Sequence, residues 1–117
     1  MEQLKGIALF YRHKALPFVT ARSKKEFQKV LEIGHIAIKR FPKEPEGFEI
    51  VGSYYLELND KRAIRYFKKA WKLSDDFGKV IVSFEVERAM RAFGQQKQAD
   101  QWRIKEILAK DTVAAAN

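Results

Sequence analysis

Cysteine is absent from this chain of 117 residues, and proline and glycine are scarce, with three and six residues. The lack of cysteine excludes a disulfide framework, a thiolate zinc site, an iron–sulfur cluster and a cysteine nucleophile. Because hydrophobic residues make up 46% of the chain, a disordered or collagen-like protein is excluded as well. We expect one folded domain over residues 1–110, with a reducing cytoplasm as the default location.

Long apolar runs are missing too. No segment approaches the roughly 20 apolar residues of a membrane-spanning helix, and the N-terminus lacks the apolar core of a secretory signal. We therefore expect no stable membrane insertion. One alternative stays open for residues 3–25, which contain no acid: their composition is also that of a mitochondrial-type leader or a membrane-surface helix. The cations of this segment are Lys5, Arg12, Lys14, Arg22, Lys24 and Lys25.

Acidic residues are outnumbered by basic ones, with 15 Asp and Glu against 23 Lys and Arg and a formal net charge of +8. Such an excess favours an anionic partner, which can be a nucleic acid, an acidic protein or a membrane surface. The composition alone does not separate these three classes.

Strand patterns are also lacking, because no useful stretch alternates apolar and polar residues. Apolar residues instead recur at helical spacing between turn and cap residues. This pattern predicts six helices in three pairs, over residues 3–14, 23–41, 46–58, 61–73, 78–93 and 97–109, and a flexible tail over 111–117. The boundaries rest on Pro17, the capping box of Ser23 and Glu26, the prolines Pro42 and Pro45, Asn59-Asp60, Asp75-Asp76 and Gly94.

Residues 61–73 separate apolar from charged side chains most clearly. At about 100° per residue, the apolar side chains fill an arc of about 160° and the cations fill an opposite arc of about 120°. The apolar set is Ala63, Ile64, Tyr66, Phe67, Ala70 and Trp71, and the basic face is Lys61, Arg62, Arg65, Lys68, Lys69 and Lys72. The three aromatic side chains should point inward, where they cannot stack on nucleic-acid bases.

The spacing of small and aromatic residues over 42–75 is typical of a helical repeat. One predicted helix carries Phe48, Val51, Gly52 and Tyr55, and the next carries Ala63, Phe67 and Ala70 as A-x3-F-x2-A. At these positions the segment resembles the tetratricopeptide repeat, a helix–turn–helix unit, although its turn is one residue shorter. The flanking pairs match loosely, as degenerate or capping repeats. The resemblance implies an all-α fold, a short α-α superhelix of about three antiparallel helix pairs.

Packing explains these residue types. Gly52 and Ala63 are small because two helices cross closely there, and we expect Phe48, Tyr55 and Phe67 to fill the space around that contact.

In the tetratricopeptide family, the first helix of each pair lines a concave groove and the second lies on the convex side. Carried over by position, the groove residues are Glu46, Glu49, Ser53, Leu56 and Glu57 in the middle pair and Phe84, Arg88 and Arg91 in the last. The resemblance thus implies an adaptor or small chaperone that holds a peptide or helix in this groove. Some family members clamp chaperone tails with a Lys-x3-Asn pair, and its absence here disfavours that version.

No constellation of catalytic residues is evident. His13 and His35 are the only histidines, and neither has the spacing of a metal or catalytic motif. Walker, dinucleotide-binding and nucleophile-elbow sequences are also missing. We expect no enzymatic activity, no metal and no cofactor.

The partner is accordingly expected to be a protein or peptide. The alternative is a nucleic-acid-associated protein that binds phosphates through the basic face of residues 61–73. A third reading gives this face no role beyond solubility. Self-association through an uncovered apolar end of the array also stays open.

Overall fold

The computed structural model describes residues 1–15 and 21–116, and the side chains of residues 1–8 and 25–116. These residues form six helices and no strand. The helices are α1 (Glu2–Ala15), α2 (Ala21–Arg40), α3 (Glu46–Glu57), α4 (Arg62–Leu73), α5 (Asp76–Ala92) and α6 (Gln96–Ala116). The predicted all-α class is therefore confirmed, as is the order of the six helices.

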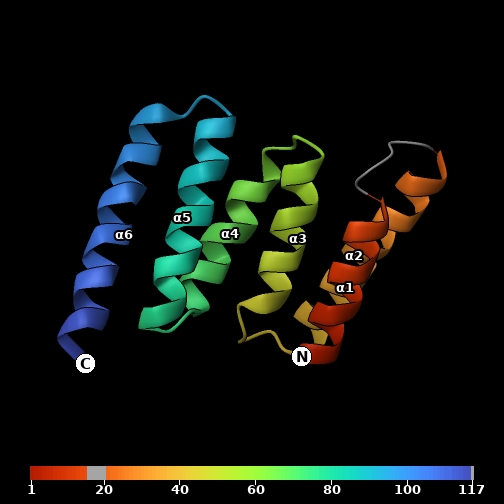
Figure 1. Ribbon diagram of the computed structural model, residues 1–117, viewed down its shortest axis with the longest axis horizontal. Helices are drawn as coiled ribbons and strands as arrows, with labels where there is room; N and C mark the ends of the chain where they lie inside the picture. Colours follow the sequence, from red (N-terminus) through yellow and green to blue (C-terminus); the bar gives the residue numbers. More distant parts are fainter. Residues whose placement is uncertain (16–20, 117) are drawn as a thin grey trace.

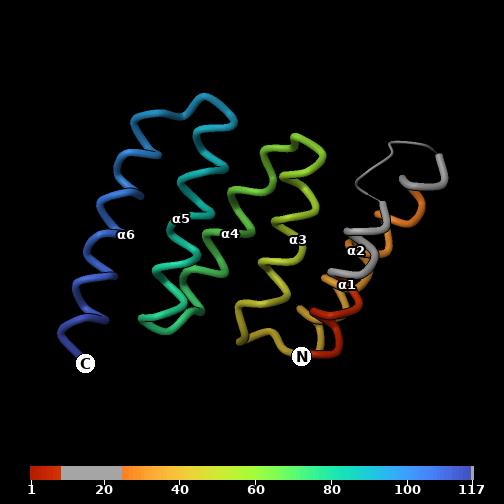
Figure 2. Tube along the Cα trace, in the orientation of Figure 1, coloured from red at the N-terminus to blue at the C-terminus, as the bar shows by residue number. Residues whose placement is uncertain are grey.

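The helices follow one another along the molecule, from α1 and α2 at one end to α6 at the other (Figure 1). Each helix packs against the next one in sequence, and α1 also contacts α3. The chain runs up and down between turns, so consecutive helices are antiparallel (Figure 2). The resulting body measures 46 × 32 × 21 Å.

One close helix crossing joins α3 and α4. The Phe67 side chain is 1% exposed, and a Cβ built on Gly52 would lie 3.0 Å from its ring. Ala63 is fully buried beside this contact, and the Tyr55 ring stacks on Tyr66 with their centroids 5.6 Å apart. The small-against-large packing that the sequence predicts is thus present.

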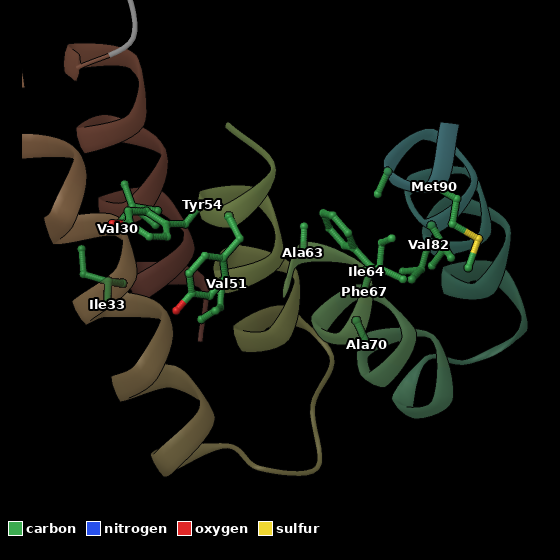
Figure 3. Packing of buried hydrophobic residues seen from close by; sticks show 14 of the residues in the cluster. Val30, Ile33, Val51, Tyr54, Ala63, Ile64, Phe67, Ala70, Val82 and Met90 are labelled. Atoms are coloured by element: carbon green, nitrogen blue, oxygen red, sulfur yellow. The ribbon is translucent and has the colours of Figure 1, made fainter. Parts of the chain in front are cut away.

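A second close crossing joins α2 and α3. A Cβ on Gly34 would lie 2.5 Å from the Cγ2 atom of Val51, so a larger residue at position 34 has no room. Gly47 approaches the backbone of Ile38 in the same interface. The buried side chains form a layer that continues from α2 through α3 and α4 to α5 (Figure 3).

Polar residues start α4 and α5 where the sequence places them. The Asp75 carboxylate accepts a hydrogen bond from the backbone N–H of Gly78 at 2.7 Å, which caps α5. The Asp60 carboxylate accepts one from the backbone N–H of Arg62 at 2.9 Å, and Asn59 turns the chain with a φ of 56°.

Three predicted helix boundaries are wrong. α5 begins at Asp76, two residues before the expected start at residue 78. α2 begins at Ala21, two residues before the expected start, while the Ser23 side chain and its capping contact lie outside the described residues. α6 continues to Ala116 and does not end near residue 109, so residues 111–116 are helical and no extended tail follows the domain there. Alanine has the highest helix propensity, and Ala114, Ala115 and Ala116 prolong the helix at no packing cost.

α6 buries less than its sequence suggests. Ala99 is fully buried, and Trp102 packs edge-on against Trp71 of α4. Three other apolar residues of this helix, Ile104, Ile107 and Leu108, are about half exposed or more. The reason is that α6 is the last helix and is covered on one side only, mainly by α5.

Candidate binding surfaces

The α3 residues predicted to line a groove share one exposed side of that helix. Three of them, Glu46, Glu49 and Ser53, line a pocket of about 400 Å³ together with Ile50. We call it the α3 pocket; its other walls come from α1 and α2, at Glu2, Lys5, Gly6, Ala8 and Val30. The structure therefore brings these three predicted residues together.

The α3 pocket is electronegative. Burial raises the pKa of Glu49, and the neighbouring charges of Glu46 and Glu85 raise it further, while Lys5 lowers it. The Oε2 atom of Glu46 is buried and has no hydrogen-bond donor among the described residues. A basic group entering this pocket would meet two carboxylates, one of them short of a donor.

The other predicted α3 residues lie outside the pocket. Leu56 is half-buried and packs against the core, and Glu57 is exposed at the C-terminal end of the helix. Of the five predicted α3 residues, three therefore line the pocket and two lie elsewhere on the same helix.

α5 presents an apolar stripe. Phe84 and Arg88 are exposed, as expected of groove residues. Phe77 and Ile81 are also exposed, at 65% and 53%, and with Phe84 they recur at helical spacing. Neither Phe77 nor Ile81 is among the residues predicted to line the groove. The available signal was that apolar residues occupy two sides of this helix, which is more than one buried face requires.

Arg91, which is also predicted to line the groove, joins α5 to α6. Its guanidinium donates hydrogen bonds to Glu87 Oε2 at 3.1 Å, Gln96 Oε1 at 2.8 Å and Asp100 Oδ1 at 2.8 Å. The hydrogen bonds to Asp100 and Glu87 raise the pKa of Arg91. Glu87 is only 7% exposed, so this arginine balances a buried carboxylate. Arg91 therefore has a structural role that its sequence position does not indicate.

The predicted basic face divides in the structure. Five of its cations line an open groove of about 570 Å³, which we call the basic groove: Lys61, Arg65, Lys68, Lys69 and Lys72, with Ile64 and Gln95 completing its lining. Arg62 is the exception. Its guanidinium pairs with the Asp60 carboxylate at 2.7 Å and lies over the Tyr55 ring at 4.3 Å. This pairing holds the pKa of Asp60 below its ordinary value.

The aromatic residues of α4 do not line that groove, although the guanidinium of Arg65 lies over the Tyr66 ring at 5.3 Å. Phe67 is buried, and Tyr66 and Trp71 are half-buried. The indole N–H of Trp71 donates to Ser83 Oγ of α5 at 2.9 Å, and the ammonium groups of Lys79 and Lys105 lie 4.8 and 4.7 Å from its ring centroid. None of the three lines the basic groove.

His35 is exposed on α2, and His13 has a side chain outside the described residues. Within the described part of the chain, no three His, Asp or Glu side chains are grouped so that they could hold a metal ion. The helices described here are each too short or too polar to cross a membrane.

Comparison of the chain with models of protein families, with curated proteins and with solved structures found no match. The α3 pocket with the α5 stripe, and the basic groove of α4, are therefore the grounds for a functional proposal.

Proposed function

We propose that this protein is a non-enzymatic interaction module, an adaptor or small chaperone of the tetratricopeptide type, which binds a peptide or helix across α3 and α5. The observations that carry the proposal are an electronegative pocket on α3 and an exposed apolar stripe on α5. Glu85 of α5 lies near enough to Glu49 for its charge to raise the pKa of that carboxyl.

The chemistry of the two parts defines the occupant. Phe77, Ile81 and Phe84 offer apolar contact area of the kind that forms the core of an interface. The carboxylates of Glu46 and Glu49 favour a cation, and the buried Glu46 oxygen needs a donor. A peptide or helix that carries apolar side chains on one part and a lysine or arginine on another can contact the apolar stripe and pair with the carboxylates.

Local charge supports this choice. The chain has a net charge of +8, so a basic segment is repelled by most of its surface and attracted at the α3 pocket. The apolar stripe then determines affinity, and the pocket determines register and specificity.

Selection from a library of short randomised peptides tests this proposal. We expect the wild-type protein to enrich peptides that combine apolar residues with lysine or arginine. Glu49→Arg should abolish binding of these peptides, and Phe84→Ala should weaken it. Ile104→Ala is the matched control, because Ile104 is equally exposed but lies on α6. Enrichment of acidic peptides, or equal binding by Glu49→Arg, would refute the proposal.

A further inference from the structure

The charged side chains that line the basic groove are all cations. Among the described residues, no carboxylate lies within ion-pair distance of Lys61, Arg65, Lys68, Lys69 or Lys72. Some cations elsewhere on the surface do pair with acids, as Lys29 does with Glu32 at 3.5 Å. Clustered, unpaired lysines repel one another, and an anionic occupant removes that repulsion.

The cations follow the axis of α4. Lys61, Arg65, Lys68 and Lys72 recur at intervals of four, three and four residues, and the backbone of Lys61 has helical angles. With a rise of 1.5 Å per residue, they span about 16 Å along the helix. One strand of a nucleic-acid duplex carries about five phosphates over that axial length. The occupant therefore has to be a linear polyanion of similar charge spacing.

The lining of the groove separates the classes of polyanion. Its single apolar residue, Ile64, is only 8% exposed, so an acidic protein would find no exposed apolar residue to form the core of an interface. Its lining contains no aromatic residue, so unstacked bases of a single strand would find no stacking platform. A duplex backbone needs neither, since it is held by cations on phosphates.

From this geometry we infer that the basic groove of α4 is a site for the phosphate backbone of double-stranded nucleic acid, read without regard to base sequence. The site is separate from the surface on α3 and α5, so the protein has two binding surfaces of opposite charge. Arg62 takes no part, because Asp60 already neutralises it.

Fluorescence anisotropy with a short labelled duplex tests this site. The logarithm of the binding constant should fall linearly with the logarithm of the salt concentration between about 50 and 200 mM. If all five cations contact phosphates, the slope should reach about −4.5. Lys68→Gln with Lys72→Gln should reduce that slope by about two, since each lysine contact contributes about one. The same change in overall charge at exposed positions outside the groove, Lys39→Gln with Lys43→Gln, should leave the slope unchanged.

Other variants and competitors define the ligand. Arg62→Gln should bind the duplex as the wild type does. Polyglutamate and a single strand of the same length should compete poorly with the duplex. The inference is overturned if the duplex does not bind at low salt, if the control pair weakens binding as much as the groove pair, or if either competitor binds more tightly. Because Glu49 and Phe84 are not involved, failure here leaves the peptide-binding proposal standing.

Discussion

The ring of Phe67 in α4 lies directly against the backbone of Gly52 in α3, where a Cβ atom would be 3.0 to 3.1 Å from three ring atoms. This contact lets the two helices approach closely and involves the largest fully buried side chain of the described residues. It also sets the position of α3, which carries the carboxylates of the α3 pocket, relative to α4, which carries the basic groove.

Gly52→Ala should therefore destabilise the protein by about 1–3 kcal/mol, because the added methyl group forces Phe67 out of its place. Gly6→Ala is the matched control: nothing lies within 4 Å of the added atom, and alanine in an exposed helix should stabilise by up to about 1 kcal/mol. Urea unfolding of the two variants measures both effects. Equal effects of the two substitutions would show that the Phe67 contact does not control the crossing.

Asp75→Ala should destabilise the protein by about 1 kcal/mol, because it removes the side-chain acceptor of the Gly78 N–H at the start of α5. Asp76→Ala removes the same charge from the same helix end but no capping bond of the described structure, so its effect should be smaller. Thermal unfolding of the two variants compares them. A larger loss for Asp76→Ala would contradict the assignment of the cap.

Glu49→Gln should stabilise the protein at neutral pH. The folded-state pKa of Glu49 is raised, so the folded protein holds this proton more tightly than the unfolded chain does. The free energy of unfolding that this group contributes is therefore lost as the pH rises from the ordinary carboxyl pKa through the raised pKa of the folded state. The gain in Glu49→Gln should vanish below the ordinary pKa, where both side chains are neutral.

Urea unfolding at neutral and at acidic pH gives both values. Glu44→Gln, in the exposed loop before α3, is the control and should change stability little at either pH. A Glu49→Gln variant that is less stable than the wild type at neutral pH would contradict this prediction, because it would show that the ionised carboxylate stabilises the folded protein.

Arg91→Met should lower the melting temperature, because Glu87 is then buried without its partner and α6 loses its tie to α5. The double variant Arg91→Met with Glu87→Leu should recover part of the loss. Arg88→Met is the control, since its pair with Glu85 at 3.1 Å lies at the surface and should matter little. Calorimetry of the four proteins completes the comparison, and equal effects of the two arginine variants would refute the role of Arg91.

Features that depend on local periodicity were predictable. The alternation of small and aromatic residues around Gly52, Ala63 and Phe67 correctly indicated a tight helix pair. Asp75 correctly marked the start of a helix, because a capping residue acts on backbone groups only three residues away. The all-helical class and the clustering of Glu46, Glu49 and Ser53 on one side of α3 follow from the same 3.6-residue period.

Features that depend on neighbours distant in sequence were not predictable. Arg91 looks like any exposed helical cation, but Asp100, with which it pairs, comes from the next helix. Gln95 joins the basic groove only because the turn between α5 and α6 folds back beside α4.

The amino-acid order, then, specifies which side of each helix is apolar, acidic or basic, because side chains repeat every 3.6 residues whatever surrounds them. It does not specify whether that side is covered. Ile81 and Phe84 on α5, and Ile104 and Leu108 on α6, have the same apolar character as core residues, but no helix among the described residues covers them. Burial and ion pairing depend on which elements meet in space, and so the exposed apolar stripe and the unpaired lysines emerge only once the helices are packed.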